Sequence, residues 1–449
     1  MSKYRSIVAA LADRIRSGEL GPGARLPAQR QLATQLGVDL TTVTRAYTEL
    51  KRMELVEGRT GSGSFVRGAP AAVAAPAREP VAFDLGMNVP PRPPGLGGRV
   101  ARDLAALLAG PEGAASLGYQ PSGGTAADRK AGASWLARRL GPTVADRMVV
   151  AAGTQSALFA LLDLLLGRGD TLACAGLTYA GMQAVAGHLG LRLAGLAHDG
   201  DGLDPQAFEA LCRAAPPKAL YLVPTIANPT TASLPLERRQ AIAAIARRHG
   251  VAIVEDDAYG ALPEAAPPPV AALAPEITWH VASLSKCATP ALRIAYVATP
   301  DAAAALRLTG GLRAISLMAS PLTAGLATRW IGDGTLDALT VEIRAENRAR
   351  QGLAAKLLPA GTVAAHPDGN HLWLSLPEGW TATAFTAAAR ESGLLVVPAD
   401  AFDVTGAGAP PRAVRLSLGG VPDRTALERA LLRLSGLLAW PGAPGAAIV

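Results

Sequence analysis

A chain of 449 residues exceeds the size at which a single hydrophobic core stops growing, so two or three domains are expected. About half of the residues are apolar and 18% are charged, which is typical of soluble globular proteins with large cores. The net charge of +7 is unevenly placed: residues 1–68 hold 11 Lys and Arg against 6 Asp and Glu, or +5, which leaves +2 for the other 381 residues. A basic module on a nearly neutral body indicates a polyanionic partner for that module.

Cysteine usage and the N-terminus favour a cytoplasmic protein without a membrane span. The three cysteines form no Cys-x-x-Cys pair, so neither a disulfide framework nor a zinc site is indicated: Cys174, Cys212 and Cys287. Asp13 and Arg14 interrupt the apolar pattern near the N-terminus, unlike a signal peptide. The uncharged run 171–191 contains polar residues and four glycines, which indicates a buried strand, a loop and a helix.

Residues 1–68 form the first predicted domain. An apolar helical repeat stops at Ser17-Gly18, and a second helix is expected from 28 to 36, ending at Gly37. Asp39 is the expected N-cap of a third helix. Its core face is predicted as Val43, Ala46, Tyr47 and Leu50, and its outward face as Thr41, Arg45 and Thr48, flanked by Thr44. A β-hairpin should follow, with strands at 55–56 and 65–66 around a Gly- and Ser-rich turn at 58–64.

The remaining chain divides into three predicted segments. Residues 69–82, APAAVAAPAREPVA, are an Ala/Pro linker too poor in side-chain bulk to build a core. From 83 to 335, short apolar strands alternate with helices, which predicts an α/β domain with a mostly parallel sheet. The strand candidates are 148–150, 219–223, 251–254 and 280–282. Residues 336–449, with a long helix and then strands near 372–376 and 414–418, predict a smaller α+β domain.

Three helices followed by a two-stranded hairpin make a winged helix-turn-helix, whose third helix fits the major groove of DNA. The segment GPGARLPAQRQLATQLGVDLTTVTRAYTELKRMELVEGRTGSGSFV resembles the DNA-binding domain of the GntR superfamily in its Gly-x-Arg-Leu-Pro run and its Gly-Ser-Gly wing. The resemblance implies that this domain binds a double-stranded DNA operator. The candidate DNA-contacting residues from the helical face, the wing and the resemblance are Arg25, Arg30, Thr41, Thr42, Thr44, Arg45, Arg59 and Gly63.

The second and third predicted domains contain candidates for each part of a pyridoxal 5'-phosphate (PLP) site, in the chain order of fold-type I aminotransferases. Such a site needs a lysine for the Schiff base, a carboxylate at the pyridine nitrogen and donors for the phosphate. Gly153-Thr154-Gln155 follows a strand and opens a helix, where free backbone N–H groups favour phosphate. Tyr179 follows the next strand, at the position whose ring stacks on the pyridine in that family.

Two further motifs supply hydrogen bonds and charge for the pyridine ring. Asn228-Pro229 resembles the Asn-Pro motif whose asparagine bonds the phenolic oxygen, although threonines follow here in place of the usual glycine. Asp256 lies just past the strand 251–254, with Tyr259 three residues on. Its flanking residues are also acidic, so the Asp-x-x-Tyr spacing selects Asp256 as the partner of the ring nitrogen and Tyr259 as a second donor to the phenolic oxygen.

The stretch Ser283-Leu284-Ser285-Lys286 is the most diagnostic, with Arg293 seven residues later. It resembles the family signature in which the lysine forms the internal aldimine and the serines and the arginine hold the phosphate. An arginine presents two donors in a fork that suits phosphate oxygens. The resemblance therefore makes Lys286 the candidate catalytic residue.

Two more residues bear on the ligand and the assembly. Arg415, in Val-Arg-Leu-Ser, resembles the arginine that clamps a substrate α-carboxylate, which implies an amino acid or a similar carboxylate as ligand. Tyr119, in Gly-Tyr-Gln-Pro, resembles the tyrosine that reaches the phosphate of the neighbouring subunit, and so implies a homodimer. The family continues with a Leu-Arg pair, whereas this chain has Asp128-Arg129-Lys130, which weakens the match at Tyr119.

The order of DNA module, linker and PLP domain resembles the MocR subfamily of GntR regulators from about residue 5 to 440. Two hypotheses follow. In the first, the chain is a transcription regulator whose PLP domain senses an amino acid, an amine or PLP itself. In the second, it is an aminotransferase for an α-amino acid with an accessory DNA-binding domain. A scaffold without PLP would be expected to lack Lys286 or Asp256, and both are present.

Overall fold

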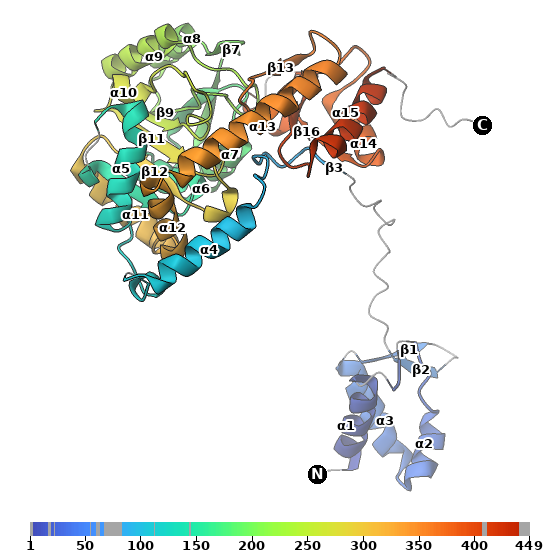
Figure 1. The fold of residues 1–449 in the computed structure, drawn as a ribbon. Coiled ribbons are helices and arrows are strands. Elements are labelled where there is room, and N and C mark those ends of the chain that lie inside the picture. Colours follow the sequence, from blue (N-terminus) through green and yellow to red (C-terminus); the bar gives the residue numbers. More distant parts are fainter. Residues whose placement is uncertain are drawn as a thin grey trace. The chain divides into compact units, whose positions relative to one another are not determined.

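A computed structural model describes residues 3–16, 19–21, 23–53, 55–59, 63–66, 83–111, 113–142, 145–405 and 411–439. Backbone contacts divide the chain into two compact units, residues 1–79 and 80–449 (Figure 1). The predicted linker at 69–82 lies outside the described residues. The other predicted boundaries, at 68 and 335, remain predictions.

The first unit contains three helices and a hairpin: α1 (Lys3–Arg16), α2 (Gln29–Leu36), α3 (Leu40–Arg52), β1 (Val56–Arg59) and β2 (Gly63–Val66). Gly37 ends α2 in the left-handed conformation, with φ at 61°. Asp39 caps α3, because its Oδ1 accepts a hydrogen bond of 2.8 Å from the backbone N–H of Thr41. Both local predictions are confirmed.

The core of the first unit lies on the predicted face of α3. Its four residues are at most 1% exposed: Val43, Ala46, Tyr47 and Leu50. They pack against Ile7 and Leu11 of α1. The hydroxyl of Tyr47 donates a hydrogen bond of 2.7 Å to the carbonyl of Pro27. The apolar repeat of α3 therefore fixes which side of this helix remains free for a partner.

The second unit is built on a seven-stranded sheet in the order β4-β12-β11-β10-β9-β5-β6. Its strands are β4 (Met148–Ala151), β5 (Thr171–Ala175), β6 (Arg192–Leu196), β9 (Ala219–Leu222), β10 (Ala252–Asp256), β11 (Thr278–Ser283) and β12 (Ala295–Ala298). β12 runs antiparallel to both β4 and β11, and the other neighbouring strands pair in parallel. The predicted mostly parallel α/β domain is confirmed. One detail differs, because Asp256 is the last residue of β10 rather than a residue beyond the strand.

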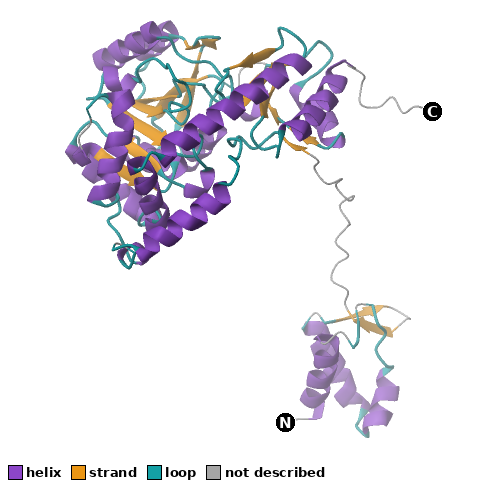
Figure 2. Cartoon of the chain, viewed as in Figure 1, coloured by secondary structure: helices purple, strands orange, loops and turns teal. Residues whose placement is uncertain are grey.

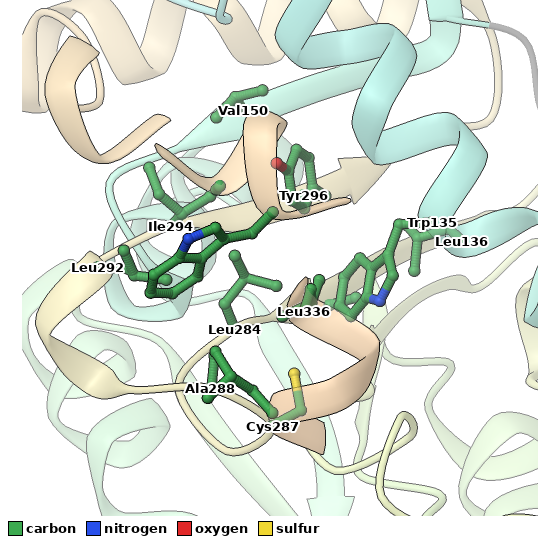
Figure 3. Packing of buried hydrophobic residues seen from close by; sticks show 14 of the residues in the cluster. Trp135, Leu136, Val150, Leu284, Cys287, Ala288, Leu292, Ile294, Tyr296 and Leu336 are labelled. Carbon is green, nitrogen blue, oxygen red and sulfur yellow. The ribbon is translucent and has the colours of Figure 1, made fainter. Parts of the chain in front are cut away.

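Helices cover both faces of the large sheet (Figure 2). They are α4 (Leu96–Ala109), α5 (Ala126–Leu140), α6 (Thr154–Leu165), α7 (Ala180–Leu189), α8 (Pro205–Ala214), α9 (Leu236–His249), α10 (Val270–Leu273), α11 (Ala302–Ser316) and α12 (Pro321–Gly332). Alternate residues of a strand enter different cores: Met148 and Val150 pack with Tyr296, while Val149 and Ala151 pack on the other face. Figure 3 shows Tyr296, Val150 and Trp135 in the first of these clusters.

A second, antiparallel sheet follows in the order β13-β14-β17-β16. Its strands are β13 (Val363–Ala365), β14 (His371–Ser375), β16 (Val397–Pro398) and β17 (Ala413–Ser417). The long helix α13 (Thr335–Leu357) contacts α12, beside the large sheet, and α15 (Arg424–Ala439), which belongs to the region of the small sheet. It therefore connects the two sheets (Figure 1). The helix α14 (Ala382–Glu391) completes this smaller α+β region.

Short pairs of strands join the remaining segments. The strand β3 (Phe83–Asp84) opens the described part of the second unit and pairs in parallel with β15 (Leu394–Leu395). The hairpin β7 (His198–Asp199) and β8 (Gly202–Leu203) lies between β6 and α8 in sequence. No described helix is long and apolar enough to cross a membrane.

Candidate functional site

A cavity of about 380 Å³ lies where the carboxyl ends of the large sheet meet residues of the small sheet. This is the edge at which open α/β sheets bind their ligands. The cavity gathers predicted residues that come from seven separate segments: Thr154, Gln155, Tyr179, Asn228, Asp256, Tyr259, Ser283, Ser285, Lys286, Arg293 and Arg415. Gly153 lies directly beside it, against Arg293.

Asp256 ends β10 at the floor of the cavity. Its Oδ2 accepts a hydrogen bond of 2.8 Å from the hydroxyl of Tyr221 on β9, whereas its Oδ1 is buried and has no partner. Burial raises the pKa of Asp256 to about 6, against the opposing effect of the Tyr221 hydrogen bond. The second carboxylate oxygen is therefore available to a cationic or N–H donor.

Lys286 lies in the turn that follows β11, and its Nζ donates a hydrogen bond to the backbone carbonyl of Asn88. The Nζ atom also lies 5.7 Å from the centre of the Tyr259 ring. Burial and the nearby Arg415 lower the pKa of Lys286 to about 8, although Asp256 acts in the opposite direction. A substantial fraction of the amine is therefore neutral near physiological pH, and the neutral amine is the nucleophilic form.

The predicted phosphate-binding residues form a cradle at the start of α6. Gly153 is the N-cap, with φ at 86°, and a Cβ atom there would lie only 2.9 Å from Nη2 of Arg293. The hydroxyl of Ser283 donates to that of Ser285 at 2.7 Å, and the same Ser283 oxygen accepts from the backbone N–H of Ser285. The unpaired N–H groups of a helix N-terminus, an arginine and two hydroxyls suit a phosphate dianion.

Tyr179 is the residue before α7, and its ring lines the cavity. Its hydroxyl lies 3.3 Å from Oε1 of Gln155, whose Nε2 donates to the carbonyl of Gly181 at 2.8 Å. A side chain at Gly181 would overlap the Tyr179 ring, because a Cβ atom would lie 2.3 Å from the ring. The glycine therefore leaves room for the predicted stacking residue.

Asn228 and Arg415 lie side by side, although 187 residues separate them in sequence. Arg415, from β17, donates a hydrogen bond of 2.9 Å to Oδ1 of Asn228 and another to the carbonyl of Gly86, while its Nε is buried without a partner. Since Oδ1 of Asn228 already accepts, the Nδ2 amino group is the end left to donate. Thr231 takes the left-handed conformation, with φ at 66°, in the turn where the family has glycine.

Four residues of the site lie outside every sequence motif that predicts a cofactor or ligand contact. Tyr221 lies on a buried strand, where its pattern indicates a core residue. The centre of the Phe402 ring lies 5.0 Å from the guanidinium carbon of Arg415. Asn88 and His371 both contact Tyr259. Tyr119, in contrast, is 85% exposed and does not line the cavity of its own chain. Its predicted place at the neighbouring subunit remains a prediction.

The predicted DNA-contacting residues lie on α2, on α3, on the hairpin and, for Arg25, in the segment before α2. Thr41, Thr44 and Arg45 are exposed on α3, and Thr42 is partly exposed. The Arg45 guanidinium lies 4.5 Å from the centre of the Tyr4 ring, and Thr44 donates a hydrogen bond of 2.8 Å to Gln29. These contacts orient the exposed side chains of Arg45 and Thr44.

The wing is joined to the segment before α2. Arg25 pairs with Phe65 of β2 through the backbone, and its Nε would lie 3.3 Å from a Cβ at Gly63. Arg30 is exposed on α2. The backbone of Arg59 ends β1, and its side chain lies outside the described residues. The exposed cationic side chains Arg25, Arg30 and Arg45 are suited to contacts with phosphate groups.

Comparison with known proteins identifies both units. Residues 84–434 match the family described as aminotransferase class I and II, and residues 3–66 match bacterial regulatory proteins of the gntR family. The chain belongs to the class I and II aminotransferase family, and a gntR-type DNA-binding domain precedes the aminotransferase-like domain in the same chain. The predicted MocR-type architecture is confirmed.

Two relatives share this arrangement over nearly their whole length. The uncharacterized HTH-type transcriptional regulator YdeF of Bacillus subtilis is 28% identical over 97% of this chain and 94% of its own. The vitamin B6 salvage pathway transcriptional repressor PtsJ of Salmonella typhimurium is 30% identical over 92% of this chain and 94% of its own. Such relatives support the regulator hypothesis over an aminotransferase with an accessory DNA-binding domain.

The second unit also resembles a solved enzyme. The α-aminoadipate aminotransferase LysN of Thermus thermophilus, in complex with N-(5'-phosphopyridoxyl)-L-leucine, is 25% identical. The match has a TM-score of 0.71 and covers 79% of this chain and 92% of that one. The fold of the aminotransferase-like domain is thus the fold that the sequence predicts.

Proposed function

We propose that this chain is a PLP-dependent transcription regulator, in which ligand binding at the cavity around Lys286 controls how a homodimer binds its DNA operator. The single observation that carries the proposal is the convergence of Lys286, Asp256 and Arg415 on one cavity, in a chain that begins with a DNA-binding domain. Allostery of this kind requires a ligand that binds two dimer conformations with different affinity.

The residues present fit PLP. Oδ1 of Asp256 is a buried acceptor without a partner, which suits a protonated pyridine nitrogen. Gly153, Ser283, Ser285 and Arg293 would hold the phosphate, with Thr154 and Gln155 opening the helix behind it. When bound, PLP supplies an aldehyde that condenses with amines and a ring that withdraws electrons.

The chain's own residues would divide the remaining work. Lys286 would hold the cofactor covalently and, with its lowered pKa, exchange a proton near neutral pH. Tyr179 would stack on the ring, and Asn228 and Tyr259 would donate hydrogen bonds to its phenolic oxygen. Arg415 would exchange its bond to the Gly86 carbonyl for a charge-assisted bond to a ligand carboxylate.

The same geometry supports proposals for the ligand and the assembly. An arginine beside the lysine favours an amino acid as effector, although an amine or PLP itself would also act at Lys286. The relative PtsJ, named for the vitamin B6 salvage pathway, supports the last of these. Tyr119 is exposed next to Leu117, at 85% and 71%, and would reach the phosphate of a second subunit. In the first unit, the residues on α3 and the wing would contact the operator, in a cytoplasmic setting.

The decisive experiment combines a visible spectrum with DNA binding. Purified protein should show an absorbance band from lysine-bound PLP, and Lys286→Ala should lose it while Lys356→Ala, an exposed lysine on α13, keeps it. Amino acids and amines are then added while the spectrum and the DNA affinity are followed. A ligand that changes both supports the proposal. An unchanged band in Lys286→Ala, or a spectral change with keto-acid formation and no effect on DNA, contradicts it.

A further inference from the structure

Asn88 lies in the loop between β3 and α4 and contacts two residues of the proposed cofactor site. Its backbone carbonyl accepts the hydrogen bond from Lys286. Its side-chain Nδ2 is 2.8 Å from the hydroxyl oxygen of Tyr259 and 3.3 Å from Nδ1 of His371. Asn88 and His371 thus form a chain of contacts that runs from the small sheet to Tyr259.

The protonation of His371 follows from its partners. The residue is fully buried on β14, and its Nε2 lies 3.2 Å from the backbone carbonyl of Ala227. A carbonyl only accepts hydrogen bonds, so Nε2 must carry the hydrogen. Burial and the nearby Arg415 lower the pKa of His371 to about 3, so the ring is neutral at physiological pH. A neutral imidazole has one hydrogen, and Nδ1 is therefore an acceptor.

The acceptor at Nδ1 fixes the orientation of the Asn88 amide. The amino group must face His371, and its second hydrogen then points to the oxygen of Tyr259. The reversed amide would place Oδ1 of Asn88 against Nδ1 of His371, and this ring nitrogen would then lose its donor. Because the Tyr259 oxygen accepts from Asn88, the hydroxyl hydrogen of Tyr259 is free for another acceptor.

We propose that His371 and Asn88 are positioning residues, which hold the Tyr259 hydroxyl as a hydrogen-bond donor toward the cavity. The acceptor is the phenolic oxygen of PLP, and in this respect the inference rests on the proposed function. The pair also ties the position of β14 and of the loop around Asn88 to the two groups, Tyr259 and Lys286, that would contact the cofactor. A movement of the small sheet would then alter cofactor binding directly.

The surroundings of Tyr259 keep its hydroxyl protonated. Burial raises the pKa of Tyr259 well above its usual value, and Asp256 and Tyr179 act in the same direction. Arg415 and the hydrogen bond from Asn88 act in the opposite direction without cancelling the effect of burial. Lys286 also faces the ring. The hydroxyl is therefore a donor at every pH at which the site would work.

A double-mutant cycle tests the positioning role. Asn88→Ala and His371→Phe, which keeps an aromatic ring beside Tyr259, should each raise the Kd for PLP about three- to tenfold, the range for one neutral hydrogen bond. In a Tyr259→Phe background neither change should raise it further. The control His188→Phe alters an exposed histidine on α7 and should leave the Kd unchanged. Equal effects with and without the Tyr259 hydroxyl would show a structural role only and overturn the inference.

A second measurement is independent of the cofactor. In nitrogen-15 spectra of histidine-labelled protein without PLP, the ring whose signal is lost in His371→Phe should be protonated at Nε2 alone between pH 5 and 8. If the His371 ring titrates near pH 6.5, or carries its hydrogen on Nδ1, the inference is overturned. Absence of PLP binding in the unmodified chain, with the expected histidine spectrum, would refute the proposed function and the acceptor, while the hydrogen-bond chain would stand.

Discussion

Gly153→Ala is the sharpest test of the proposed phosphate cradle. At φ 86° and ψ 169°, the backbone of Gly153 is in a region that residues with a side chain adopt only with strain, which costs about 1–3 kcal/mol. The new methyl group would also lie 2.9 Å from Nη2 of Arg293, closer than real Cβ contacts allow. The guanidinium must therefore move away from the helix N-terminus.

The chain offers a control glycine with a similar positive φ. Gly169 has nearly the same φ, 85°, and no atom lies within 4 Å of a Cβ at that position. Gly169→Ala should therefore lower stability without disturbing Arg293. Displacing Arg293 removes at least one charge-assisted hydrogen bond to phosphate, worth about 1.5–3 kcal/mol. This corresponds to a roughly 10- to 150-fold rise in the Kd for PLP in Gly153→Ala alone.

Two assays separate these effects. Thermal unfolding of the protein without PLP reports the strain, and titration with PLP followed by absorbance reports the cradle. Both variants should have a lower Tm, and only Gly153→Ala should bind PLP weakly. If Gly153→Ala binds PLP as tightly as the unmodified chain while Arg293→Ala does not, the predicted contact between the two residues is wrong. Equal weakening in both glycine variants would assign the effect to lost stability.

Three further predictions concern other parts of the chain. Arg45→Ala should weaken operator binding about tenfold, in contrast to Arg213→Ala on the exposed face of α8, and an intact gel shift would argue against the proposed recognition face. Tyr221→Phe removes the hydrogen bond that lowers the pKa of Asp256, so PLP binding should weaken more at pH 6 than at pH 8, as measured by titration at both pH values. Because the pKa of Lys286 is about 8 in the folded state and 10.5 in the unfolded state, the unfolded lysine binds more protons between these values. Denaturant unfolding of the PLP-free proteins should therefore show the stability of the unmodified chain rising relative to that of Lys286→Met from pH 8 to 10.5.

The sequence by itself determined the local features of this protein. The repeat of Val43, Ala46, Tyr47 and Leu50 defined the buried face of α3, because helical periodicity and capping depend on neighbours within a few residues. The segment from Ser283 to Lys286 was recognisable for a related reason, since all its members lie on one turn after one strand. The mostly parallel sheet also followed from the alternation of strands and helices.

Only the tertiary structure decided which distant residues meet. Asn88 contacts Tyr259 across 171 residues and His371 across 283, and nothing in the local sequence of these residues indicates either contact. Tyr221 reaches Asp256 because β9 and β10 are neighbours in the sheet, although the pattern of β9 indicates only a buried strand. Local patterns fix which face of an element is buried, whereas strand order and the placement of the small sheet set which side chains share the cavity, and these depend on the packing of the whole chain.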